Sequence, residues 1–261
     1  MALNRDDVAV EDLSFGGAGE AVEAYLVRPA GAAPAGRHPG LVMWHWLDTE
    51  APDGNRTEFL EEARSLAGRG VVSLLPQGRF PWRIDPSGAA PDAKEVEAEV
   101  ARFRAAVDFL VEVAGVDPGC VAAAGHDFGA MLAILATASD PRISGVVAMT
   151  PTPRWADWFL PFWAIAEDRI DYLAAMRRLD PVERIAGIAP RPILLQLADR
   201  DFYVAPMAGF ELRRAAGESS AVELKRYDAQ HGLRHPDAVA DREEFLARVL
   251  NLQPEVGAAP R

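Results

Sequence analysis

The sequence predicts a single α/β domain with a mostly parallel central sheet that is flanked by helices. Three observations predict it. Short apolar runs, typical of buried strands, alternate along the chain with longer amphipathic segments, typical of helices. A glycine-rich turn within residues 125–130 lies between one such strand and one such helix. The length of 261 residues and the hydrophobic fraction of 49% are enough to fill the core of one large domain, residues 1–261.

The first half of the chain is expected to form five strands and two helices. The strands are predicted at residues 8–13, 21–27, 41–44, 71–75 and 121–124. Thr57 is a candidate N-cap for a helix that ends at Gly68 and Gly70. Apolar residues at helical spacing predict a long amphipathic helix over residues 94–114.

The second half continues the alternation. Strands are predicted at residues 145–149, 193–197 and 222–227, and helices at 131–136, 206–216 and 236–252. Apolar strands that are separated by helices indicate a parallel sheet that is covered on both faces. The tail, residues 253–261, is expected to be frayed.

One stretch departs from this alternation. Residues 150–184 hold three tryptophans and several prolines, followed by an amphipathic segment, and we expect a small aromatic-rich lid inserted in the domain. The stretch follows a core strand, on the side where an α/β sheet places its ligand crevice. Its aromatic residues either shape an apolar pocket or pack the lid onto the body, and the sequence leaves both open.

Composition limits the classes of partner. The net charge of −12 argues against a nucleic acid or an anionic membrane surface, which select basic proteins. The N-terminus lacks the basic and apolar regions of a signal peptide, and no apolar run reaches the ~20 residues that span a bilayer. The single cysteine, Cys120, excludes an intrachain disulfide and suits a cytoplasmic location. The partner expected is a small-molecule substrate, and the oligomeric state is not defined.

No cofactor is implied. The chain has no HExxH motif, no cysteine cluster and no glycine-rich phosphate loop, so no metal ligands are predicted. A GxGxxG fingerprint is also absent, so a nucleotide cofactor is not indicated.

The turn at residues 125–130, GHDFGA, carries the most chemistry. A strand, a tight turn flanked by small residues and a buried helix form the nucleophile elbow, G-x-Nu-x-G, of α/β-hydrolases. Gly125 and Gly129 are placed where the tight turn leaves no room for a side chain. The nucleophile position is occupied by Asp127, where most such enzymes carry Ser or Cys.

Chain order then locates the other catalytic groups, because this fold places an acid and then a histidine after the nucleophile. Asp201 follows the strand at 193–197 and is preferred as the acid over Asp199, which is alternatively an ion-pair partner of Arg200. His231 follows the strand at 222–227 and is the candidate base. His126 is expected to pack or hydrogen-bond beneath the turn instead.

The chain resembles the dienelactone hydrolase-like group of α/β-hydrolase-fold enzymes over nearly its full length. The resemblance rests on GHDFGA, APRPILLQLADRDFYVAP and YDAQHGL, and it implies a cofactor-independent hydrolase. Two positions depart from the pattern. Dienelactone hydrolases carry Cys at the elbow, and many relatives carry Gly where this chain has Trp46. In its Asp elbow, the chain resembles epoxide hydrolases and dehalogenases.

The fold also predicts an oxyanion hole and a substrate pocket. Its donors would be the backbone N–H of Trp46 or Leu47, from the loop after the strand at 41–44, and that of Phe128. Candidate pocket residues are His45, Trp82, Trp155, Trp158, Tyr172 and Tyr203. Either tyrosine would serve as the acid for epoxide opening, and each is alternatively a half-buried packing residue.

The carboxylate at the elbow favours attack on a saturated carbon. Attack of Asp127 on an epoxide or a carbon–halide bond gives an ordinary alkyl ester, which water activated by His231 would hydrolyse. Attack on an ester would instead give a mixed anhydride. We therefore expect an Asp127–His231–Asp201 triad with an alkyl-enzyme ester on Asp127.

Two alternatives remain. In the first, the protein is a dienelactone hydrolase-like esterase or lactonase in which Asp127 is a base or an orienting group. In the second, it is a non-catalytic binding protein with the same fold. The survival of all three catalytic positions in workable order argues against the second.

Overall fold

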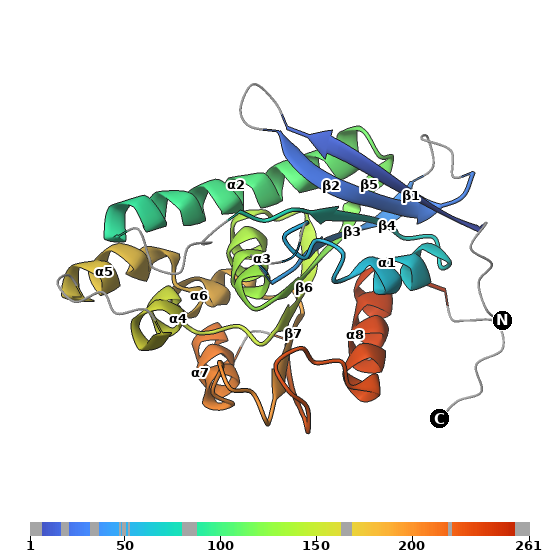
Figure 1. Ribbon diagram of the computed structural model, residues 1–261. Coiled ribbons are helices and arrows are strands. Elements are labelled where there is room, and N and C mark those ends of the chain that lie inside the picture. Colours follow the sequence, from blue (N-terminus) through green and yellow to red (C-terminus); the bar gives the residue numbers. More distant parts are fainter. Residues whose placement is uncertain are drawn as a thin grey trace.

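A computed structural model describes residues 7–16, 21–31, 37–46, 48, 51, 53–79, 88–162, 169–218 and 221–253. The described residues form an eight-stranded sheet in the order β1-β2-β4-β3-β5-β6-β7-β8. The strands are β1 (Val8–Phe15), β2 (Val22–Pro29), β3 (His38–Trp44), β4 (Val72–Pro76), β5 (Val116–His126), β6 (Ile143–Met149), β7 (Ile193–Ala198) and β8 (Val222–Tyr227). β1 pairs with β2, and β2 with β4, in antiparallel fashion, and the remaining neighbours are parallel. The predicted α/β fold with a mostly parallel sheet is confirmed (Figure 1).

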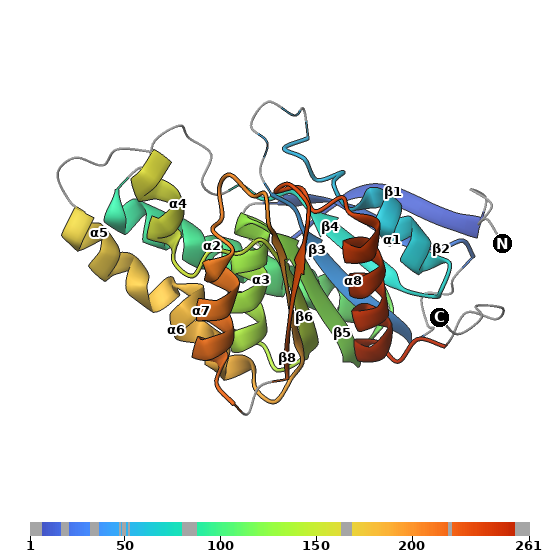
Figure 2. The ribbon, with the colours of Figure 1, turned by 90° about the horizontal axis from the view of Figure 1, so that it is seen from below.

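Helices cover both faces of the sheet (Figure 2). α1 (Leu60–Ala67) and α8 (Pro236–Val249) lie on one face, and α2 (Ala89–Glu112), α3 (Phe128–Ser139) and α7 (Met207–Ala216) lie on the other. Each face of the sheet has its own hydrophobic core. Alternate residues of one strand belong to different cores, because successive side chains of a strand point to opposite faces. In β3, Leu41 and Met43 pack with α1 and α8, whereas Val42 and Trp44 pack with α2 and α3.

Between β6 and β7, short helices replace a simple crossover. They are α4 (Trp155–Phe162), α5 (Arg169–Met176), η2 (Arg177–Leu179), α6 (Pro181–Arg184) and η3 (Ile185–Ile188). They gather beside α2 and α7 at one end of the molecule (Figures 1 and 2). This segment covers the stretch expected to form a lid, and a lid role in catalysis stays a prediction.

Three helix starts differ from the sequence prediction by three residues or more. α3 begins at Phe128 rather than at Met131. α1 begins at Leu60, and Thr57 lies in the preceding turn without capping the helix. α2 begins at Ala89 rather than at Lys94, because a proline is tolerated in the first turn of a helix and Pro91 does not delay it.

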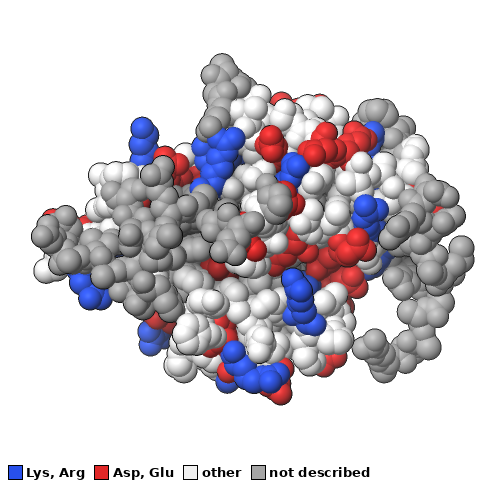
Figure 3. All heavy atoms as spheres, viewed as in Figure 1, with Lys and Arg blue, Asp and Glu red and all other residues white. Residues whose placement is uncertain are grey.

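Surface charge and helix length are the features that would indicate a charged partner or a membrane-spanning helix. In Figure 3, acidic and basic side chains are interspersed over the visible face, and acidic atoms gather near its middle. Within the described ranges, no helix combines the length and the apolar character that crossing a bilayer needs.

Candidate active site

Asp127 lies at the sharp bend between β5 and α3. Its backbone has φ 57° and ψ −117°, and its N–H donates to the carbonyl of Met149 on β6 at 2.8 Å. A positive φ of this kind is costly for most residues and is tolerated best by Gly, Asn and Asp. The bend therefore presents the Asp127 side chain at the carboxyl end of the sheet.

The two glycines of the turn are required by close backbone approach. A Cβ on Gly125 would lie 2.1 Å from the carbonyl oxygen of Gly129. A Cβ on Gly129 would lie 2.0 Å from the carbonyl oxygen of Trp44. No side-chain movement relieves a clash with backbone, so only glycine fits at either position.

His231 comes from the loop after β8 and lies between two carboxylates. Its Nδ1 is 2.9 Å from Oδ2 of Asp201, and its Nε2 is 3.5 Å from Oδ2 of Asp127. Asp201 also accepts hydrogen bonds from the backbone N–H groups of Tyr203, at 2.8 Å, and Val204, at 3.0 Å. The structure thus brings together the three side chains that the sequence nominated from three distant loops.

The alternative acid, Asp199, points elsewhere. It pairs with Arg226 at 2.7 Å, and its neighbour Arg200 pairs with Asp228 at 2.7 Å. The ion pair between Asp199 and Arg200 that we weighed is therefore not formed. Asp201, and not Asp199, contacts the imidazole.

Burial and charge set the protonation of the three groups. Burial raises the pKa of the Asp127 carboxyl above its ordinary value, and the hydrogen bond and charge of His231 offset this only in part. Burial alone would lower the pKa of His231, but its hydrogen bonds with Asp127 and Asp201 outweigh burial and raise it to about 10. The bond from His231 likewise outweighs burial at Asp201 and lowers the pKa of that carboxyl. Both neighbouring carboxyl groups therefore favour the protonated form of His231.

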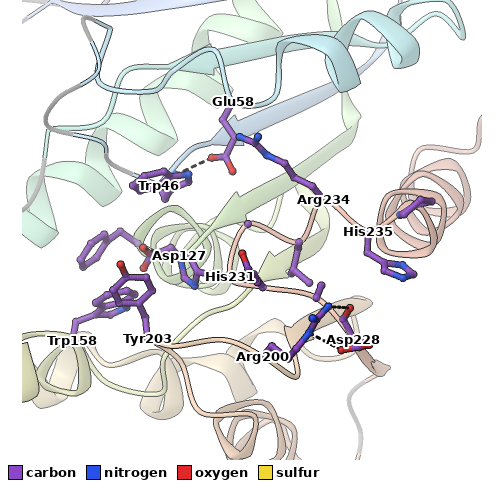
Figure 4. Close-up of a pocket in the computed structure, with 16 residues that line it drawn as sticks. Trp46, Glu58, Asp127, Trp158, Arg200, Tyr203, Asp228, His231, Arg234 and His235 are labelled. Atoms are coloured by element: carbon purple, nitrogen blue, oxygen red, sulfur yellow. Dashed lines mark hydrogen bonds and ion pairs between the residues drawn. The ribbon is translucent and has the colours of Figure 1, made fainter.

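A cavity of about 730 Å³ opens at this site. Phe128, Trp158 and Tyr203 line one side of it, together with Asp127 and His231 (Figure 4). Trp158 lies 5.0 Å from Phe128, 5.7 Å from Tyr203 and 6.0 Å from His231 between ring centroids. Trp46 and the charged residues Glu58, Arg200, Asp228 and Arg234 also line the cavity, so it has charged as well as aromatic walls.

The two oxygens of the Asp127 carboxylate differ in their surroundings, and Oδ2 is the one that faces Nε2 of His231. Oδ1 is buried and has no hydrogen-bond partner among the described residues. Since a buried carboxylate oxygen without a partner is costly, this atom calls for a donor from water or from substrate. Among the described residues, no group of three or more His, Cys, Asp or Glu side chains is arranged to hold a metal ion.

The predicted pocket residues divide into two groups. Trp158 and Tyr203 line the cavity, as expected. His45, Trp155 and Tyr172 do not, and their assignment to the pocket is wrong. Trp82 lies outside the described residues, so its place in the pocket stays a prediction.

The three misassigned residues are packing residues whose polar atoms are satisfied inside the body. Nδ1 of His45 bonds the carbonyl of Trp46 at 2.6 Å, and its Nε2 accepts from the N–H of Gly78 at 3.1 Å. The indole N–H of Trp155 donates to the carbonyl of Leu179 at 2.9 Å. The hydroxyl of Tyr172 donates to Asp92 at 3.0 Å, and both side chains are buried.

The predicted oxyanion donors are only partly accounted for. The N–H of Trp46 donates to Oε2 of Glu58 at 3.1 Å, so another group already holds this amide (Figure 4). Phe128 is the first residue of α3, directly after Asp127, and its ring lines the cavity. Leu47 lies outside the described residues. The donor roles of Phe128 and Leu47 stay predictions.

Sequence reasoning missed Glu58. Its carboxylate bonds the Trp46 amide and also pairs with Nδ1 of His126, whose Nε2 is 3.0 Å from the carbonyl oxygen of His231. The expectation that His126 hydrogen-bonds beneath the turn is correct, but its partner was not foreseen. The available signal was position, because Glu58 follows β3 and so lies at the carboxyl edge of the sheet.

Comparison with known proteins adds a family and a fold. The model of the dienelactone hydrolase family matches residues 22–252. No curated protein sequence matches the chain.

Three solved structures illustrate the likeness in fold. An acetyl xylan esterase from Paenibacillus sp. R4 is 19% identical, with 95% of this chain and 86% of that chain covered and a TM-score of 0.71. A putative dienelactone hydrolase from Klebsiella pneumoniae subsp. pneumoniae MGH 78578 is 19% identical over 94% and 98%, with a TM-score of 0.65. A prolyl endopeptidase is 20% identical with a TM-score of 0.72, and 96% of this chain spans only 40% of that one.

Proposed function

This chain belongs to the dienelactone hydrolase family and is a hydrolase of that family, and on this premise we propose that it cleaves a small ester or lactone with Asp127 as general base. The acetyl xylan esterase among its structural neighbours supports ester chemistry on the same fold. In this proposal Asp127 replaces the serine or cysteine nucleophile by a group that activates water.

The protonation of His231 carries the proposal. With a pKa raised to about 10, this imidazole already holds its proton at neutral pH and cannot take one from a nucleophile. It can donate one. Asp127, whose Oδ2 is 3.5 Å from Nε2 of His231, is the proton acceptor that remains.

The reaction then balances without a covalent intermediate. A water molecule at the Asp127 carboxylate gives a proton to that carboxylate while its oxygen attacks the carbonyl carbon of the ester. As the tetrahedral intermediate collapses, Nε2 of His231 gives its proton to the departing alkoxide. Asp127 then returns its proton to His231, and the products are the acid and the alcohol. Asp201 keeps the imidazole oriented through Nδ1, 2.9 Å away.

The cavity suits this substrate class. Its volume of about 730 Å³ accommodates a small molecule. The aromatic wall of Phe128, Trp158 and Tyr203 offers apolar contact to the body of the substrate. The charged side chains that also line the cavity would meet its polar end.

A second candidate function is hydrolysis of an epoxide or a carbon–halide bond through an alkyl ester on Asp127. One observation favours it: a carboxylate occupies the nucleophile position itself, at φ 57°, with an unpartnered oxygen. Alkylation would neutralise Asp127 and remove one of the two carboxylates that hold the His231 proton. Opening an epoxide would consume that proton, and the neutral imidazole could then activate water.

A single turnover in ¹⁸O-labelled water, with enzyme in excess, distinguishes the two functions. The probes are p-nitrophenyl acetate and γ-butyrolactone for ester chemistry, and styrene oxide and 1-bromobutane for alkyl chemistry. The general-base route puts the label in the acid product and none in the peptide that contains Asp127. The alkyl route puts the label in that peptide. Full ester hydrolysis by the Asp127→Asn variant would refute the proposed role of Asp127.

A further inference from the structure

A second carboxylate–imidazole pair lies directly behind the catalytic one. Glu58, in the turn before α1, pairs through Oε1 with Nδ1 of His126, the last residue of β5. The rings of His126 and His231 are 5.0 Å apart between centroids. Neither Glu58 nor His126 has a part in the reaction proposed above.

Both nitrogens of His126 are occupied. Nε2 faces the main-chain carbonyl of His231 at 3.0 Å, and a carbonyl can only accept, so Nε2 carries a hydrogen. Nδ1 faces Oε1 of the Glu58 carboxylate. The imidazole is buried and clamped at two ends, so it holds its partners at fixed positions.

The second oxygen of Glu58 extends this connection to another loop. Oε2 accepts the N–H of Trp46 at 3.1 Å (Figure 4). The carbonyl of Trp46 in turn accepts from Nδ2 of Asn55 at 3.1 Å. Three successive hydrogen bonds therefore connect the loop after β3 to the loop after β8. They join Trp46 to Glu58, Glu58 to His126, and His126 to the carbonyl of His231.

The loop after β8 is partly exposed. Gln230, Gly232 and Arg234 are exposed, whereas the ring of His231 points inward to Asp127 and Asp201. The distance from Nε2 of His231 to Asp127 is already 3.5 Å, so a small displacement of the loop would interrupt proton transfer between them. The hydrogen bond from His126 fixes the main chain of His231, whose side chain must stay in contact with Asp127 and Asp201.

We propose that Glu58 and His126 are positioning residues that hold the His231 main chain through its carbonyl and tie it to the Trp46 amide. The inference deepens the proposed function, since it concerns the same site and rests on the use of His231 there. It assigns a role to two side chains that contact the catalytic groups but do not exchange protons with substrate.

Hydrogen–deuterium exchange tests this role without any substrate. The readout is the exchange rate of main-chain amides in peptides that cover residues 228–235. We expect Glu58→Ala to raise that rate at least tenfold, because it cuts the connection at its centre. Glu58→Gln, which can still accept from Trp46 and donate to His126, is expected to stay within about threefold of the wild type.

A matched control removes a carboxylate elsewhere. Glu211 on α7 pairs with Arg154, is also partly exposed and does not line the cavity. Glu211→Ala should leave exchange in residues 228–235 unchanged. His126→Phe tests the next link, because it keeps an aromatic ring, removes both hydrogen bonds and should also raise the rate at least tenfold. Unchanged exchange in either Glu58→Ala or His126→Phe would overturn the proposal, as would an equal effect of Glu211→Ala.

Activity on p-nitrophenyl acetate gives the second readout. We expect kcat of Glu58→Ala to fall at least tenfold and kcat of Glu58→Gln to recover most of that loss. A wild type that hydrolyses no ester, combined with the expected exchange pattern, would refute the proposed reaction and leave the positioning role standing. Normal ester hydrolysis with unchanged exchange in Glu58→Ala would refute the positioning role alone.

Discussion

Asp201 and His231 are joined by a hydrogen bond of 2.9 Å, although β7 and β8 deliver them from separate loops. The bond orients the imidazole so that its other nitrogen faces Asp127. A histidine held between two carboxylates keeps its proton to a higher pH than one held by a single carboxylate.

The free energy of unfolding should fall at alkaline pH as His231 loses its proton. Its pKa of about 10 in the folded state lies above the ordinary value of 6.5, so its contribution is fully present below about pH 6.5 and is lost as pH rises through about 10. The groups that face it are Asp127 and Asp201, with His126 behind. Urea unfolding at pH 7 and pH 10.5 should show the wild type losing up to about 4 kcal/mol more than His231→Gln. An equal loss in both proteins would contradict the assigned protonation.

Asp127→Ser should convert the site to serine chemistry. With one carboxylate removed, His231 retains only Asp201, so its pKa falls and it becomes able to accept the serine proton. A fluorophosphonate probe should label this variant and leave the wild type and Asp127→Ala unlabelled, as intact-mass measurement would report. A folded Asp127→Ser variant that resists the probe would show that His231 does not reach the bend.

Tyr172→Phe should affect stability and not catalysis. The Tyr172 hydroxyl donates to Asp92 inside the body, and loss of one buried hydrogen bond to a charged group typically costs about 1.5 to 3 kcal/mol. Thermal unfolding should report the loss, while kcat on the probe ester stays within about twofold. Lower activity with unchanged stability would return Tyr172 to the list of candidate acids.

Gly129→Ala should abolish folding or lower stability by more than about 3 kcal/mol, because the added Cβ would meet the Trp44 carbonyl oxygen at 2.0 Å. Gly187 provides the control. A Cβ there comes no closer than 3.7 Å to Ala138, so Gly187→Ala should fold normally. Circular dichroism melts of the two variants make the comparison, and equal melting temperatures would contradict the close approach described at the elbow.

Strands and the elbow were predictable because their signals are local. Residues 145–149 fall inside β6 and residues 193–197 inside β7, since runs of buried apolar residues leave few alternatives. The elbow was predictable from the two glycines, Gly125 and Gly129, that the tight turn requires. Chain order in a known fold then led to Asp201 and His231, because each follows a strand that ends at the same edge of the sheet.

Orientation was not predictable. His45 and Trp155 follow strands that end at that edge, and Tyr172 lies in the stretch expected to form the lid, but a pattern of residue types does not tell which way a ring turns. Each turns inward, where its polar atom finds a main-chain or carboxylate partner. Glu58 was not predictable for a different reason. Its contact with His126 joins residues that are 68 positions apart in the chain, and no local pattern indicates such a contact.

The rings of His231 and Trp158 meet edge-on, at 6.0 Å between centroids and 80° between planes. This contact should make the fluorescence of Trp158 depend on the protonation of His231. A charged imidazole quenches the emission of a nearby indole, so this tryptophan should brighten when the neighbouring histidine loses its proton. A ligand that enters between the two rings would change the same signal, and occupancy of the cavity can then be followed by fluorescence without any label.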